Sequence, residues 1–188
     1  QELAIKEEQA KAAVQLIDEG NTIPFIARYR KEMTGALNDE TLRNLHERLL
    51  YLRNLEEKKE QVINAITDQG KMTEDLKKKI LSAETLVAVD DLYRPYRPKK
   101  QTRATKAKEK GLEPLANILL LQKTTKSMEE EAAAFVNAEK GVANAKEAIA
   151  GAKDIIAEMI ADMADYRKSI RNCTMKQGSL VVKAKDED

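Results

Sequence analysis

The chain has 188 residues, which suits one domain or two small ones and is enough for a buried core. Its 33 Lys and Arg nearly balance 32 Asp and Glu, so only the distribution of charge is informative. A high helix-former content with 7 Gly and 4 Pro is typical of helix-rich proteins. No apolar run approaches the roughly 20 residues of a membrane span. The single cysteine, Cys173, fits a reducing, cytoplasmic compartment.

Helical patterns open the chain. Apolar residues at helical spacing predict a helix over roughly 3–19, and the chain begins at Gln1 inside this pattern, which indicates a fragment of a longer protein. Pro24 suits the first position of a short second helix. We expect Phe25 and Ile26 on that helix to be buried.

The longest predicted helix runs from about Asp39 to Asp68, with Asn38 as its N-cap. Apolar residues from Leu42 to Ile66 recur at steps of three and four, so the helix must pack against other helices or pair in a coiled coil. The step becomes irregular near Lys58, which favours packing against shorter helices.

The remaining elements are also mostly helical. Residues 85–89 are ambiguous between strand and helix, and 179–183 are a candidate strand. Helices are predicted over 74–83, 103–110, 114–121, 128–135, 144–163 and 166–172. The fold class is therefore expected to be all-α, an elongated multi-helix domain with two long helices.

The segment 90–110 interrupts the helical pattern. From Arg94 to Lys110 it has eight cations against one acid, a local charge of +7 that leaves −6 on the rest of the chain. Lysine and arginine neutralise phosphates, and the interleaved Tyr93 and Tyr96 can stack on unpaired bases. This basic loop is the first candidate for sequence-independent contact with nucleic acid, through Arg94, Arg97, Lys99, Lys100, Arg103 and Lys106.

A structural interpretation of the same loop stays open. The prolines that follow Arg94 and Arg97 favour extended backbone at both arginines, and the tyrosines are able to wedge between helices. The arginines are equally able to pair with Asp90 and Asp91 or to bind helix C-termini. A second, weaker basic cluster surrounds Tyr29 and consists of Arg28, Arg30 and Lys31.

Residues for catalysis are sparse. His46 is the only histidine and lies inside the long predicted helix, where a surface or interface role is expected. The sequence has no glycine-rich phosphate loop, no zinc-protease motif and no paired cysteines. The adjacent Asp90 and Asp91 are a weak metal hypothesis. We therefore predict no enzyme activity, no catalytic or metal-binding residues and no cofactor.

Several separated runs resemble one family in order along the chain: Ile23–Glu32, Asp91–Lys100, Glu109–Ala116 and Gly151–Glu158. They are similar to signatures of the Tex proteins, bacterial transcription accessory factors. The resemblance implies a Tex N-terminal-like helical region over 1–122, with a helix-turn-helix-like part and the basic loop 90–110. A second helical segment over 123–188 would lead into downstream domains that are not in this chain, among them an RNA-binding OB-fold.

The resemblance implies nucleic acid, RNA or DNA, as a partner, together with the transcription machinery. Binding in the family is associated mainly with the missing C-terminal part. The prediction is a monomeric, cytoplasmic, non-catalytic nucleic-acid-binding fragment of a Tex-like protein. The alternative is a helical scaffold or protein-interaction module that positions the missing RNA-binding domains. A self-associating coiled coil along Leu42–Ile66 ranks third.

Overall fold

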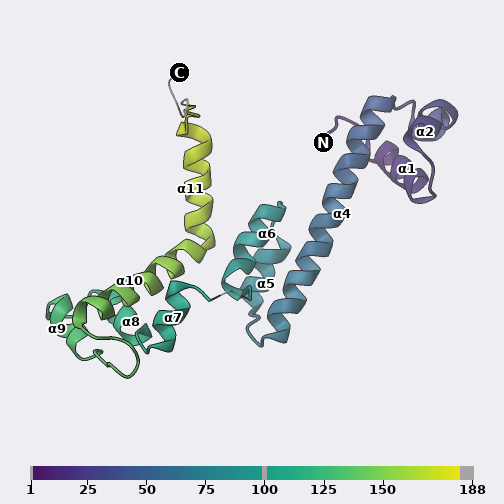
Figure 1. Ribbon diagram of the computed structural model, residues 1–188. Helices are drawn as coiled ribbons and strands as arrows, with labels where there is room; N and C mark the ends of the chain where they lie inside the picture. The colour runs from purple at the N-terminus through teal and green to yellow at the C-terminus, as the bar shows by residue number, and fades with distance from the viewer. Residues whose placement is uncertain (1, 99–100, 183–188) are drawn as a thin grey trace, which may run out of the picture. The chain divides into compact units, whose positions relative to one another are not determined.

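The computed structural model describes residues 2–98 and 101–182, and over these ranges the chain is all-α (Figure 1). Two helices are long, α4 (Asp39–Asp68, 30 residues) and α10 (Ala145–Asp162, 18 residues), as predicted. The others are α1 (Glu7–Asp18), α2 (Ile23–Tyr29), α3 (Lys31–Thr34), α5 (Glu74–Leu81), α6 (Leu86–Tyr93), η1 (a 3₁₀ helix, Arg94–Tyr96), α7 (Arg103–Glu109), α8 (Glu113–Leu121), α9 (Met128–Ala133) and α11 (Ala164–Gln177).

The two uncertain segments resolve differently. Residues 86–89 lie in helix α6 and Thr85 directly precedes it, which settles the ambiguity in favour of helix. The candidate strand at 179–183 is wrong over 179–182, which have no regular structure, and Lys183 lies outside the described residues. The only β-type pairing within 2–98 and 101–182 is an isolated bridge between Asn137 and Val142. No helix in the part of the chain that the structure describes is long and apolar enough to cross a membrane.

Local capping explains why several helices begin where the sequence indicates. The Asn38 side chain accepts a hydrogen bond from the Thr41 N–H at 2.8 Å, which satisfies a free donor in the first turn of α4. Ser127 and Glu130 cap each other's backbone N–H at the start of α9, with distances of 2.9 and 3.2 Å. The polar caps therefore fix helix starts independently of tertiary packing.

The chain divides into two compact units. Among the described residues, the first consists of 2–72 with 84–86, and the second of 73–83, 87–98 and 101–182. These are units of packing, so the predicted domain division after residue 122 and its helix-turn-helix-like part stay predictions. The first unit has a core between α1, α2 and the start of α4, formed by Ala13, Leu16, Ile26, Leu37, Leu42 and Leu45.

A side-chain bridge fixes the turn after α3 in the first unit. Gly35 adopts a left-handed conformation with φ of +60°, which glycine tolerates best. The Gln9 amide from α1 donates to the carbonyls of Thr34 and Gly35 at 3.2 and 3.0 Å. A Cβ at residue 35 would lie 2.7 Å from the Gln9 nitrogen, so close approach also favours glycine there. The bridge ties the end of α3 to α1.

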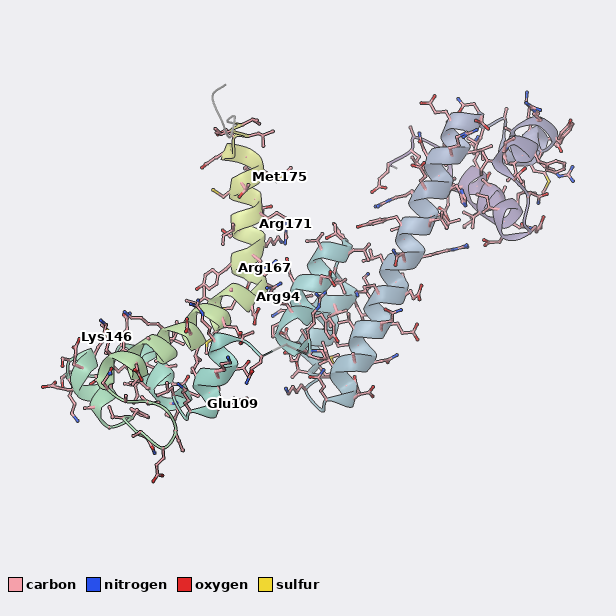
Figure 2. All side chains as sticks on the ribbon, in the orientation of Figure 1. Arg94, Glu109, Lys146, Arg167, Arg171 and Met175 are labelled. Atoms are coloured by element: carbon pink, nitrogen blue, oxygen red, sulfur yellow. The ribbon has the colours of Figure 1, made fainter. Side chains whose placement is uncertain are left out.

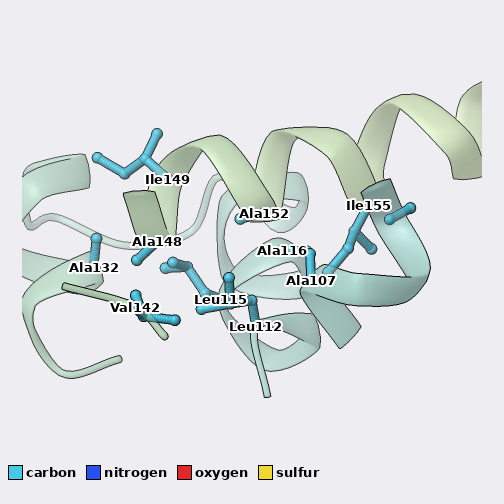
Figure 3. Close-up of a cluster of buried hydrophobic side chains, with 11 residues drawn as sticks. Ala107, Leu112, Leu115, Ala116, Ala132, Val142, Ala148, Ile149, Ala152 and Ile155 are labelled. Atoms are coloured by element: carbon cyan, nitrogen blue, oxygen red, sulfur yellow. The ribbon is translucent and has the colours of Figure 1, made fainter. Parts of the chain in front are cut away.

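The second unit has its core where α10 packs on α7, α8 and α9 (Figure 3). Small residues along α10 allow this close approach. Gly151 is the extreme case, because a Cβ there would lie 2.5 Å from the Leu112 Cδ1 and 3.2 Å from the Ala107 Cβ. The buried members of this core are Ala104, Ala107, Leu112, Leu115, Ala116, Ala132, Val142, Ala148, Ile149, Ala152 and Ile155.

Candidate nucleic-acid interface

The two arginines before prolines in the basic loop are both paired with carboxylates. Arg94, at the start of η1, donates from Nε to Asp162 at the end of α10, over 2.9 Å. Arg97 donates to Asp90, and its guanidinium lies 5.5 Å from the centre of the Tyr93 ring. Arg97 has the extended backbone that the sequence predicts. The same prediction is wrong for Arg94, which lies in the 3₁₀ helix.

Helix α11 supplies two further arginines to this region (Figure 2). Arg167 and Arg171 lie one turn apart, and each donates to a different oxygen of Asp91 at 2.7 Å. The Asp91 side chain is only 8% exposed. Burial raises the pKa of this carboxyl, but the hydrogen bonds from both arginines outweigh it and bring the pKa below its usual value. We call Asp91, Asp162, Arg94, Arg167 and Arg171 the arginine–carboxylate cluster.

This cluster lies beside a hollow of about 610 Å³. Asp91 and Asp162 line it together with Leu92, Pro95 and Tyr96, as well as residues of α5 and α10. The interpretation that neighbouring arginines pair with these acids is confirmed for Asp90, which binds Arg97, and wrong for Asp91, whose partners are Arg167 and Arg171 of α11. No three His, Cys, Asp or Glu side chains within 2–98 and 101–182 come together in a way that could hold a metal ion.

The remaining predicted cations of the loop are more accessible. The Arg103 side chain is 87% exposed and lies 3.5 Å from Asp154, a longer ion pair than those of the cluster. Lys106 is exposed and has no ion pair among the described residues. Lys110 is occupied differently, because it donates to the Gly141 carbonyl at 2.7 Å. The predicted residues Lys99 and Lys100 lie outside the described residues.

The second basic cluster is built around two aromatic rings of α2. Phe25 and Tyr29 are one helical turn apart, with ring centroids 5.3 Å from each other. Phe25 was expected to be buried, and this is wrong, since it is 37% exposed. The expectation that Ile26 is buried is confirmed. Phe25 instead packs between the Tyr29 ring and the Arg30 guanidinium, which lies 5.3 Å from the centre of the Phe25 ring.

Two cations of this cluster are free of carboxylates. Arg28 and Lys31 are exposed, and neither has an ion pair within the part of the chain that the structure describes. They line a hollow of about 470 Å³ between α2 and the start of α4. Arg43 lines it as well, paired with Asp39 at 2.6 Å. Three cations therefore face one carboxylate, an excess of positive charge that suits an anionic ligand.

Some of the predicted cations are therefore paired with carboxylates and others are exposed, and they are divided between the two units. Arg28, Arg30 and Lys31 belong to the first unit, and Arg94, Arg97, Arg103 and Lys106 to the second. Sequence reasoning missed Arg43, Arg167 and Arg171. The spacing of Arg167 and Arg171 by four residues was a usable signal, because it places both guanidinium groups on one face of a helix.

Comparison of the sequence with known proteins identifies its family. The sequence model of the Tex-like protein N-terminal domain matches residues 1–67, and that of the Tex central region matches 123–188. The chain belongs to the Tex family. The first of these Tex matches contains the aromatic pair of α2 with Arg28 and Lys31, whereas the basic loop 90–110 lies between the two matched ranges.

Three relatives illustrate the reach of the Tex family. Protein YhgF of Escherichia coli is 47% identical over 190 residues, covering all of this chain and 24% of that protein. The transcriptional accessory protein Tex of Neisseria gonorrhoeae is 42% identical, covering 92% of this chain and 22% of its own length. The human S1 RNA-binding domain-containing protein 1 is 34% identical, and the match covers 87% of this chain and 16% of that protein. The chain thus spans about a quarter of the length of its bacterial Tex relatives.

Proposed function

We propose that this chain contributes a non-catalytic, sequence-independent nucleic-acid-binding surface to a cytoplasmic Tex-family transcription accessory protein. The observation that carries the proposal is the pair of exposed cations Arg28 and Lys31, which have no ion pair among the residues that the structure describes, beside the exposed ring of Tyr29. Arg103 and Lys106 add accessible charge in the second unit. Relatives named for transcription and for RNA binding agree with this role.

Pairing decides which cations are available to phosphate. A free surface lysine or arginine gains counterion-release free energy on binding a phosphate. An arginine already hydrogen-bonded to a carboxylate must first give up that bond and leave the carboxylate without its partner. Arg94 and Arg97 are in this second state, so they contribute less than the sequence alone indicates.

The test is a titration of labelled single-stranded and duplex oligonucleotides at two salt concentrations. If the pair Arg28 and Lys31 of the first unit, or the pair Arg103 and Lys106 of the second, contacts two phosphates of a single strand, log K at that surface should fall against log salt with a slope of roughly −1.4. Replacing all four with glutamine should abolish both the binding and its salt dependence. The matched control replaces Lys123 and Lys126, two exposed lysines of the α8–α9 linker, and should bind like the parent. Undetectable binding at low salt would refute the proposal.

A second function has its own supporting observation. The arginine–carboxylate cluster joins η1, α6, α10 and α11, and none of the side chains of α11 is buried. Charged contacts rather than an apolar core therefore hold α11. Such contacts suit a monomeric scaffold that fixes the direction of this helix. The helix would then be presented to other parts of a larger protein or to a component of the transcription machinery. If Asp91→Asn disorders α11 and leaves oligonucleotide affinity unchanged, the arginine–carboxylate cluster has this scaffold role.

A further inference from the structure

We infer that Tyr29 is a stacking platform for an unpaired base, so that the surface of α2 and α3 takes single-stranded nucleic acid in preference to duplex. This inference rests on the proposed function and names the ligand class of its first-unit surface. The Tyr29 side chain is 62% exposed, unusually open for a large aromatic residue. An exposed ring beside unpaired cations is the combination that non-specific single-strand binders use.

Three of the other tyrosines, Tyr51, Tyr93 and Tyr96, lack this openness. Tyr166 is also exposed, at 51%, but the arginine next to it, Arg167, is paired with Asp91. The Tyr93 ring is covered by the Arg97 guanidinium at 5.5 Å, and the Tyr51 ring by Arg48 at 5.0 Å. No guanidinium contact of this kind covers Tyr29 in the described part of the chain. The tyrosines that the sequence offered for stacking, Tyr93 and Tyr96, are both half-buried. Tyr29 of α2 is therefore a better candidate for stacking than the tyrosines of the basic loop.

The Tyr29 ring is supported from below. Phe25 lies against it with an interplanar angle of 43°, and the Arg30 guanidinium closes over Phe25. The helix that carries both rings is anchored by the fully buried Ile26, and the Gln9 bridge ties the next helix, α3, to α1. A ring held in this way loses little conformational freedom when a base stacks on it.

Cations that are able to contact phosphate lie next to the ring in the sequence or line the neighbouring hollow. Arg28 directly precedes Tyr29, and with Lys31 and Arg43 it lines the hollow between α2 and α4. Phe25 and Tyr29 share one face of α2, because residues four apart are neighbours on a helix, while Arg28 lies about a quarter turn away. A strand whose backbone follows the hollow is thereby able to place a base on Tyr29. In a duplex, both faces of each internal base are already stacked, so the ring gains nothing.

The test uses fluorescence anisotropy with labelled oligothymidylate and a blunt-ended duplex, and compares three single variants of the whole chain. Tyr29→Leu should weaken single-strand binding by about 5- to 150-fold, the usual range for losing one base–aromatic stack, and should leave duplex affinity within about twofold. Tyr29→Phe keeps the ring and should bind like the parent. Tyr166→Leu removes an exposed tyrosine of α11, 51% exposed, and serves as the matched control.

Salt dependence separates stacking from charge. Tyr29→Leu should lower affinity without changing the slope of log K against log salt, whereas Lys31→Gln should reduce the slope by about 0.7. Equal single-strand affinities for Tyr29→Leu and Tyr166→Leu would overturn the inference and leave the proposed function standing. A loss in Tyr29→Phe as large as that in Tyr29→Leu would also overturn it, because the hydroxyl would then be the contact. Absence of any oligonucleotide binding by the parent would overturn the proposed function as well. Circular dichroism of each variant confirms that the fold is retained.

Discussion

Asp91→Asn is the sharpest perturbation of the arginine–carboxylate cluster. The substitution preserves the size of the side chain but removes its negative charge, and it replaces one acceptor oxygen with an NH₂ donor. Arg167 and Arg171 each donate to one oxygen of Asp91 at 2.7 Å, so one arginine then faces a donor and the other a neutral acceptor. Because α11 has no buried side chain, these bonds are a large part of what attaches it.

The magnitude follows from the two hydrogen bonds and their exposure. A hydrogen bond to a charged group contributes about 1.5–3 kcal/mol. Both arginine side chains remain about one third exposed, so water and salt partly replace what Asp91 provides. We therefore expect the pair of bonds to contribute about 1.5–3 kcal/mol together rather than twice that. Since about 1.4 kcal/mol corresponds to a factor of ten, protection of the α11 amides should fall by roughly 10- to 150-fold.

Native-state hydrogen exchange measures this locally. The amides of α11 should lose protection, while those of α8 and the middle of α10 should not, because their core does not involve Asp91. The matched control is Lys168→Gln, an exposed lysine of α11 without an ion pair among the described residues. Unchanged protection of α11 in Asp91→Asn, or an equal loss in Lys168→Gln, would refute the argument that the cluster holds this helix.

Three further predictions test the core, the acid response and the availability of cations. Leu115→Ala should cost about 2–5 kcal/mol in urea unfolding because Leu115 is fully buried, whereas Leu49→Ala should cost about 1 because Leu49 is half-buried beside a surface hollow; equal costs would contradict the burial. Because the pKa of Asp91 is lowered in the folded state, its contribution to stability is present above about pH 4 and is lost as the pH falls through the folded-state pKa. Asp91→Asn should therefore flatten the acid side of a curve of unfolding free energy against pH. An unchanged curve would contradict this role of Asp91. Arg94→Gln should lower the free energy of unfolding and leave oligonucleotide affinity nearly unchanged, whereas Arg28→Gln should lower the affinity and leave stability nearly unchanged. Urea unfolding and fluorescence anisotropy on both variants measure the two quantities. The same pattern in both variants would refute the distinction between paired and unpaired arginines.

Local signals in the sequence predicted much of the helical frame. The bounds of α4 follow from the Asn38 cap, the acids behind it and a long apolar stripe, all of which act within one element. The start of α1 at Glu7 rather than near residue 3 was not predictable in this way. Leu3 and Ile5 pack on the first core without being helical, and apolar spacing does not distinguish packing from helix.

Phe25 shows the same limit for burial. A phenylalanine on a short helix beside Ile26 satisfies every local criterion for a core residue, yet only Ile26 faces the core. Which of two adjacent apolar residues turns inward depends on how α2 meets α1 and α4, a tertiary property. The outward position of Phe25 then creates the aromatic surface that the sequence did not reveal.

The candidate site was predictable in composition but not in pairing. Residue types locate the two groups of cations along the chain, because charge is a property of the sequence. Their partners are separated by 68 residues for Arg94 and Asp162, and by 76 and 80 for Asp91 with Arg167 and Arg171. No local pattern specifies contacts at that distance along the chain. The arginines with the most suggestive sequence context therefore proved to be those already paired.

Proline accounts for part of this outcome. In the segment Arg94–Pro98, the two prolines restrict the backbone, so the arginines beside them lose little freedom on pairing. A restricted arginine is well suited to a fixed carboxylate, since its planar donors must be aligned to form short hydrogen bonds. Binding to a polyanion without sequence preference does not require such alignment, because many backbone positions of the ligand are equivalent. The features that make the basic loop conspicuous thus favour an internal ion pair. The exposed side chains of Arg28, Lys31 and Lys106, which have no carboxylate partner among the described residues, suit phosphate better.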